Sequence, residues 1–331
     1  MRLHFPAVLV VAALTTGVAA VPAQRTPRMN PVIELLEQHK PVFGLYAPSN
    51  RRGGRGPGAT AATGATGAGE KSPAELAAEA VAYKQSDFVF DGSMEGGLDR
   101  ALPAFSAFVA GMQQAGALMK SPLRLTHPLI VKTPDSDVPT LHADIGRQLS
   151  LGVSGLMLPK AESAEQVRQA ILAMRFKSKG GTRAEDVGSA AAYWRLSEAE
   201  YKRKADVWPL NPEGELINWT IVESKEGLAK VREIAAVKGI GVLWPGAGTL
   251  RGIFSTPNAA GERVLDEKAW EGAIQQVLAA CKEFKVACGY PATANDIEMR
   301  MKQGFSVFVM GWGEQGFKAV EAGRRAANRT N

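Results

Sequence analysis

Three charged residues close short apolar runs in this sequence, in positions where side chains can act on a small anionic substrate. Asp91 ends the run DFVFD, Lys132 ends LIVK, and Glu223 ends WTIVE. A carboxylate can serve as a general base or as a ligand of a divalent cation, and a lysine can bind a carboxylate or enolate through its charge. This combination predicts the binding of a small acid, with or without a divalent ion.

The stretch from Ile217 to Gly252 shows how such residues are brought together. It contains an apolar strand that ends on Glu223, an amphipathic helix, a second strand from Ile240 to Trp244, and a glycine-rich turn. Both strands of a β-α-β unit end on the same side of a parallel sheet, where α/β enzymes hold their substrates. We expect the backbone of the turn to bind a substrate carboxylate at the start of the following helix. The turn consists of Pro245, Gly246, Ala247 and Gly248.

The whole chain repeats this alternation of strand and helix. Each strand is an apolar run with little alternation, as expected when both faces are buried, and each is followed by a helical pattern. Eight such units predict a (β/α)8 barrel, with a doubly wound open sheet as the alternative. The eight predicted strands are centred near Val42, Phe88, Leu129, Leu156, Trp219, Val242, Ala287 and Val307.

A barrel directs the carboxyl ends of all strands to one shared pocket. Tyr46 stands at the end of the first strand and is expected to line that pocket. Glu95 follows Asp91 in the next loop and is a candidate base, although it could equally be a solvated residue ahead of a helix.

Five segments of the chain, in order and spacing, resemble the HpcH/HpaI aldolase and citrate lyase β-like family. The resemblance implies a (β/α)8 barrel of the phosphoenolpyruvate/pyruvate-binding type. It also implies a metal-dependent carbon-carbon lyase of the aldolase type, which acts on a 2-oxo acid through a pyruvate-enolate-like intermediate. The segments are PVFGLY, DFVFDGSMEGG, IVKTPD, LGVSGLMLPKAESAEQVRQAI and TIVESKEGLAKVREIAAVKGIGVLWPGAGTL.

The resemblance assigns roles to particular residues. It makes Glu223 a ligand of Mg or Mn and Lys132 the stabiliser of a carboxylate or enolate, in the place of a family arginine. The second metal ligand of the family falls at Ala247 or Gly248, which carry no carboxylate, so the cation would be weakly held.

The acid/base pair of the family is also replaced. Its histidine falls at Met94, and the aspartate that supports this histidine falls at Ser150. Glu95, next to Met94, could serve as the base or as a second metal ligand. The active site is therefore expected to be divergent.

Two alternatives stay open at this point. Lys132 could form a Schiff base with a 2-oxo acid instead of acting as an anion-binding charge. The barrel could also have lost catalysis and act as a periplasmic binding protein for small carboxylates.

The chain ends and composition add further expectations. Residues 1–23 read as a signal peptide, or alternatively as an uncleaved anchor, and predict a secreted or periplasmic protein without a membrane span in the mature chain. Residues 24–331 form one predicted barrel domain with a flexible loop at 50–70 and an insertion at 176–216. The charge of +6 is scattered, which argues against nucleic-acid binding.

Two further questions concern pairing within and between chains. Cys281 and Cys288 are either free thiols or a disulfide. The family resemblance implies a homo-oligomer, with the helix at 315–327 as a candidate contact.

Overall fold

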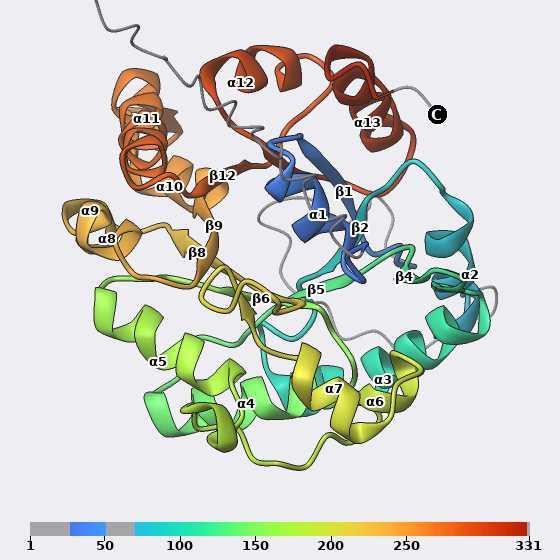
Figure 1. The fold of residues 1–331 in the computed structure, drawn as a ribbon. Coiled ribbons are helices and arrows are strands. Elements are labelled where there is room, and N and C mark those ends of the chain that lie inside the picture. The colour runs from blue at the N-terminus through green and yellow to red at the C-terminus, as the bar shows by residue number, and fades with distance from the viewer. Residues whose placement is uncertain (1–26, 51–69, 330–331) are drawn as a thin grey trace, which may run out of the picture.

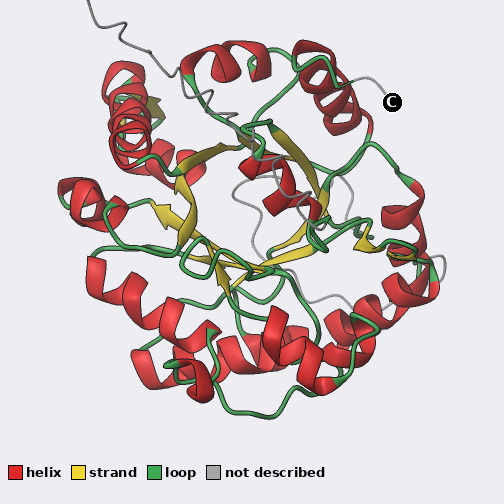
Figure 2. Cartoon of the chain, viewed as in Figure 1, coloured by secondary structure: helices red, strands yellow, loops and turns green. Residues whose placement is uncertain are grey.

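The computed structural model describes residues 27–50 and 70–329, which form a closed barrel of parallel strands surrounded by helices (Figures 1 and 2). Strand β6 pairs with β5 on one side and with β8 on the other, which closes the sheet. The predicted (β/α)8 barrel is confirmed, and the open sheet is excluded. The barrel strands are β1 (Val42–Tyr46), β2 (Phe88–Asp91), β5 (Leu129–Lys132), β6 (Gly155–Leu158), β8 (Leu216–Val222), β9 (Ile240–Pro245), β12 (Ala287–Tyr290) and β13 (Val307–Met310).

The outer ring consists of amphipathic helices that follow the strands. Polar caps fix where several of them begin: the side chains of Ser72, Asp137 and Ser163 each accept a hydrogen bond from a backbone N–H of the first turn. The outer helices are α2 (Pro73–Ala82), α3 (Leu98–Gln114), α4 (Val138–Leu149), α5 (Ala164–Met174), α8 (Lys225–Ala229), α9 (Val231–Ala235), α10 (Ala247–Ile253), α11 (Glu267–Phe284), α12 (Ile297–Gln303) and α13 (Glu314–Ala326).

The inside of the barrel is filled by large side chains. Trp219 stacks on Trp244 with ring centroids 5.6 Å apart, and its other neighbours include Phe88 at 5.2 Å. Gly289 makes room for this layer, because a Cβ atom at that position would lie 1.8 Å from the Trp244 ring. The interior is therefore a packed core, and only the ends of the strands are open to a substrate.

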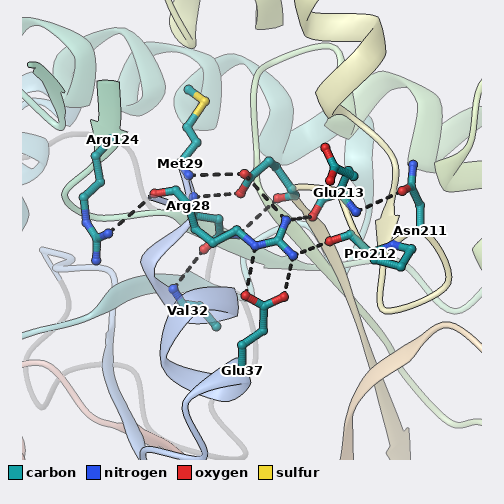
Figure 3. Close-up of polar contacts among 11 residues, drawn as sticks. Arg28, Met29, Val32, Glu37, Arg124, Asn211, Pro212 and Glu213 are labelled. Carbon is teal, nitrogen blue, oxygen red and sulfur yellow. Dashed lines mark hydrogen bonds and ion pairs between the residues drawn. The ribbon is translucent and has the colours of Figure 1, made fainter. Parts of the chain in front are cut away.

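The amino ends of the strands are covered by α1 (Pro31–Glu37), which lies in the middle of the barrel in Figure 1. Its side chains of Val32, Ile33 and Leu36 pack into the same core as the first residue of β1. Just ahead of the helix in the chain, Arg28 forms ion pairs with the buried Glu215 and with Glu37 of α1, and Figure 3 shows its contacts with Glu37 and Pro212.

Residues 176–216 lie at this same amino end, because they connect the end of α5 to the start of β8. Trp194 anchors them by donating a hydrogen bond from Nε1 to the carbonyl of Gly152, just ahead of β6 (2.8 Å). A position at the amino ends keeps this segment away from the predicted site. Its elements are the 3-10 helix η1 (Lys177–Lys179), α6 (Ala190–Tyr193), α7 (Glu198–Lys204) and β7 (Val207–Trp208).

Some local features differ from the sequence-based expectations. Two small hairpins, β3 (Leu118–Lys120) with β4 (Leu123–Leu125) and β10 (Ser255–Pro257) with β11 (Arg263–Leu265), were not predicted. Three-residue strands are too short to show a period. The single helix expected after Glu223 is divided into α8 and α9.

The cysteine question is resolved in favour of a disulfide. Cys281 in α11 and Cys288 in β12 are bonded, with their Cα atoms 5.7 Å apart, and both are buried. The bond ties the end of α11 to the strand that follows it.

Two predicted segments lie outside the described residues. These are the signal peptide at 1–23 and all but the first and last residue of the loop at 50–70. Within the two described ranges, no helix combines the length and the apolar character that a membrane crossing requires.

Candidate active site

The predicted site residues are gathered at the carboxyl ends of the barrel strands. Tyr46, Asp91 and Lys132 are the last residues of β1, β2 and β5, and Glu223 directly follows β8. Strands β1, β2 and β5 are consecutive neighbours in the sheet, so three of these four residues stand side by side at one rim. This rim is the place where a (β/α)8 barrel holds its substrate.

Glu223 is the most firmly held of these side chains. The residue is buried, and each carboxylate oxygen accepts one hydrogen bond: Oε1 from the backbone N–H of Lys160 (3.1 Å) and Oε2 from the hydroxyl of Thr249 (2.7 Å). The Nζ atom of Lys132 lies 3.7 Å from Oε1. Two donors and one cation thus fix both the direction and the charge of this carboxylate.

Lys132 links Glu223 to a second carboxylate. Its Nζ atom lies 2.5 Å from Oε1 of Glu95, and only 13% of the Lys132 side chain is exposed, against 47% for Glu95. An Nζ atom held between two carboxylates is arranged as an ammonium ion. This geometry favours the anion-binding role of Lys132 over the Schiff base.

Asp91 and Tyr46 complete the rim. Asp91 is buried and accepts a hydrogen bond from the backbone N–H of Ser93 (2.6 Å) at Oδ1. Its register partner on β5 is Val131, so it stands beside the strand end that carries Lys132. Tyr46 packs edge-on against Phe90, with ring centroids 5.0 Å apart.

The turn after β9 approaches Glu223 closely. A Cβ atom on Gly246 would lie 2.3 Å from the Cβ atom of Glu223, so only glycine fits there. The N–H of Gly246 donates to the carbonyl of Val222 (2.9 Å) and is therefore not available to a substrate. Of the predicted carboxylate-binding turn, the amides of Ala247 and Gly248 at the start of α10 stay candidates.

Two partners of Glu223 were not predicted from the sequence. Thr249 could have been found, because it is the only polar side chain between Pro245 and Leu250. Lys160 contributes its backbone, and its φ of 47° lies in the left-handed region, which residues other than glycine rarely adopt. Such local strain is typical of functional sites, and no sequence pattern revealed it.

The positions assigned to the family's acid/base pair hold no such pair. Met94 is fully buried, and its sulfur accepts the Nε2 amide of Gln148 (3.6 Å). Ser150, where the family's supporting aspartate falls, caps the end of α4, and its hydroxyl donates to the carbonyl of Gly146 (2.8 Å). Gln148 instead supports the rim, since its Nε2 also donates to the carbonyl of Lys132 (3.2 Å).

The side chains around Glu223 do not form a set of ligands for Mg or Mn. Within the described parts of the chain, no group of three or more His, Cys, Asp or Glu side chains could hold a metal ion. Both oxygens of Glu223 already accept hydrogen bonds, and an ammonium ion lies 3.7 Å away. Hard divalent cations require several oxygen ligands and, at Glu223, would face the charge of Lys132. The side chains present do not fit a cation held by the protein alone.

Solved structures resemble this fold. An HpcH/HpaI aldolase/citrate lyase family protein from Burkholderia cenocepacia superposes with a TM-score of 0.59 and 21% identity, covering 91% of this chain and 98% of that one. The HpcH/HpaI aldolase from Desulfitobacterium hafniense gives 0.58 and 16%, covering 85% and 89%. Macrophomate synthase gives 0.57 and 15%, covering 91% and 88%. At these sequence identities, the similarity is evidence for a shared fold and for nothing more.

Comparison of the sequence with known proteins identifies the family. A hydroxypyruvate/pyruvate aldolase from Delftia acidovorans is 30% identical over 164 residues, which are 50% of this chain and 54% of the aldolase. The chain therefore spans about half the length of this curated relative. The profile of one family matches residues 112–321, more than half of the chain. The chain belongs to the HpcH/HpaI aldolase/citrate lyase family.

Proposed function

We propose that this protein is a carbon-carbon lyase of the aldolase type, which acts on a 2-oxo acid through a pyruvate-enolate-like intermediate. The observation that carries the proposal is the Glu95–Lys132–Glu223 ion-pair chain at the carboxyl-end rim. Family membership and the similarity to a hydroxypyruvate/pyruvate aldolase support the reaction class.

The chemistry assigns a role to each group. In the cleavage direction, a base removes the proton of the hydroxyl at C4 of a 4-hydroxy-2-oxo acid, the C3–C4 bond breaks, and an aldehyde leaves. The electron pair of that bond forms the pyruvate enolate, which is then protonated at C3. We assign the base to Glu95, which is half exposed at the carboxyl-end rim, with Asp91 as the second acid/base candidate.

The substrate must also be held while its charge moves. Lys132 is placed to neutralise the carboxylate or the enolate oxygen, and Glu223 holds Lys132 in position. Tyr46 and the turn of Pro245, Gly246, Ala247 and Gly248 form the remaining wall, with the amides of Ala247 and Gly248 as donors. The family resemblance predicted weak binding of Mg or Mn at Glu223; the donor set described above does not favour it, and no step above depends on a metal.

The experiment is a measurement of pyruvate release from a series of 4-hydroxy-2-oxo acids by the purified protein and by Glu223→Gln. The proposal predicts release that depends on Glu223. The second candidate, a binding protein for small carboxylates, is favoured by the buried Met94, which offers no proton. Calorimetric binding of pyruvate without release from any member of the series supports that candidate and contradicts the lyase.

We further propose that the protein is secreted or periplasmic. The basic start and the apolar run within residues 1–23 support this location, as does the Cys281–Cys288 disulfide, since such bonds persist in oxidising compartments. Fractionation of a producing cell tests it, and retention in the cytoplasm contradicts it.

The proposed homo-oligomer rests on the family resemblance alone, and sedimentation of the purified protein tests it.

A further inference from the structure

Lys132 occupies the position between the two carboxylates that would otherwise attract a free cation. Its Nζ atom lies 2.5 Å from Glu95 and 3.7 Å from Glu223. The side chain is largely buried, so its charge is only weakly screened by water. The ammonium ion therefore balances carboxylate charge that a divalent ion would balance in a metal site.

The surroundings of Lys132 keep it in this place. The carbonyl of Lys132 accepts the amide of Gln148, and residue 132 pairs in register with Met157 of β6. Glu223 is fixed independently by Lys160 and Thr249. The cation and one carboxylate are thus each held by their own part of the barrel, as expected for a prearranged charge pair.

The second lysine at the rim differs in a useful way. The Nζ atom of Lys160 lies 3.7 Å from Asp135, its side chain is 53% exposed, and its contact with Glu223 is made by the backbone. Removal of the Lys160 side chain leaves that hydrogen bond in place. Lys160 therefore provides a matched control for the loss of a lysine at this rim.

We propose that Lys132 is a built-in replacement for a divalent cation: the protein binds and turns over its 2-oxo acid with the Lys132 ammonium ion as the only cation at Glu223. The statement about turnover rests on the proposed lyase function. The replacement of a divalent cation by Lys132 concerns charge alone and does not depend on that function. Removal of Lys132 leaves Oε1 of Glu95 and Oε1 of Glu223 without the cation that lies between them. These are hard oxygen donors, which Mn²⁺ and Mg²⁺ prefer.

The test measures Mn²⁺ binding, by electron paramagnetic resonance of free Mn²⁺ and by the melting temperature, without any substrate. The proteins are the wild type, Lys132→Met, Lys132→Arg, the control Lys160→Met, and the double variant Lys132→Met with Glu223→Gln. At about 1 mM Mn²⁺, the wild type, Lys132→Arg and Lys160→Met should show neither bound Mn²⁺ nor a higher melting temperature. Lys132→Met should bind Mn²⁺ at least about tenfold more tightly, and the double variant should lose this gain.

Two results overturn the proposal. One is a folded Lys132→Met that binds Mn²⁺ no more tightly than the wild type, whether or not the wild type binds it. The other is pyruvate release by the wild type that a chelator abolishes and Mn²⁺ restores. If Lys132→Met does not fold, Lys132→Arg and the wild type are compared at the same Mn²⁺ concentration. Mn²⁺ binding by both proteins contradicts the proposal, and binding by neither supports it. A protein without lyase activity can still give the predicted Mn²⁺ result, so the two proposals fail separately.

Discussion

The two ends of the barrel each hold a buried glutamate beside a cation, but they use it differently. At the amino end, Glu215 accepts the backbone N–H groups of Met29 (3.2 Å) and Asn30 (2.9 Å), and Arg28 lies 3.8 Å away. At the carboxyl end, Glu223 accepts two donors in the same way, and Lys132 lies 3.7 Å away.

The difference lies in what else the cation contacts. Arg28 uses its whole guanidinium group within the protein: it donates to Glu37 and to the carbonyls of Pro212 and Gly214, as Figure 3 shows in part. Lys132 has Glu95 as its other partner, and about half of that side chain is exposed. The partners of Arg28 at the amino end all belong to the scaffold, and this cluster stabilises the fold. The ion pairs of Lys132 at the carboxyl end reach the half-exposed Glu95, at the rim where a barrel binds its substrate.

Burial also acts on the amino-end glutamate. Burial raises the pKa of Glu215 above its ordinary value, although the N–H groups of Asn30 and Met29 and the charge of Arg28 oppose this shift. Loss of Arg28 leaves the carboxylate with its two backbone donors and the weaker effect of the Lys204 charge.

The largest expected effect tests the amino end. Arg28→Met should lower the free energy of unfolding by about 3 kcal/mol, because it leaves a buried carboxylate without its cation. Chemical denaturation measures this loss, and pyruvate release per folded molecule should stay unchanged. A fall in release at full folding would break the division between the two ends.

Glu223→Gln should have the opposite signature. The neutral amide no longer holds the charge of Lys132, and we expect pyruvate release to fall about 100-fold. The free energy of unfolding should fall by less than the about 3 kcal/mol expected for Arg28→Met, because Lys132 keeps Glu95 as its ion partner. Steady-state kinetics and denaturation of the same preparation measure both quantities. A large loss of stability with full activity would assign Glu223 to the scaffold.

Asp206 extends the comparison to the insertion at the amino end. Burial alone would raise its pKa, but hydrogen bonds from Arg175, Asn211 and the N–H of Val207 outweigh this and lower it. A lowered pKa means that the stabilisation is present above the unfolded-state pKa and is lost as the pH falls through the folded-state pKa. Asp206→Asn should cost about 2 kcal/mol at neutral pH, and this difference should shrink in acid.

Melting curves across the acid range provide the check for Asp206. A difference between Asp206→Asn and the wild type that stays constant down to the lowest pH would show that the carboxylate charge does not act as described.

Thr249→Val should have the smallest effect. The variant keeps the shape of the side chain and removes one hydrogen bond to Glu223, which is worth about 1 kcal/mol. Pyruvate release should fall about fivefold, because 1 kcal/mol corresponds to this factor. Thr249→Ser, which keeps the hydroxyl, is the control and should retain most of the activity.

The fold was readable from the sequence because each barrel strand is a continuous apolar run followed by a helical pattern. The strand centred on Trp219, for example, needs both faces buried, and only a closed or covered parallel sheet provides this. The hairpins at 118–125 and 255–265 left no such pattern, because their strands are short and pair antiparallel outside the barrel sheet.

Only part of the site could be predicted from the sequence. The strand ends located Asp91, Lys132 and Glu223, because the ends of parallel strands meet at one rim. The sequence could not show the hydrogen bond from the backbone N–H of Lys160 to Glu223, since this contact joins two loops that are distant along the chain. The same limit hid the contact between the Met94 sulfur and the Gln148 amide.

The most direct test of the central claim follows the methyl protons of pyruvate in D2O by proton NMR. A protein that forms a pyruvate enolate exchanges these protons for deuterium, whichever aldehyde it uses. The account predicts exchange by the wild type and by Arg28→Met at a temperature where both are folded. It predicts little exchange by Glu223→Gln or Lys132→Met. An exchange rate for the wild type that equals the rate without protein, at pyruvate concentrations that saturate binding, would contradict the lyase assignment.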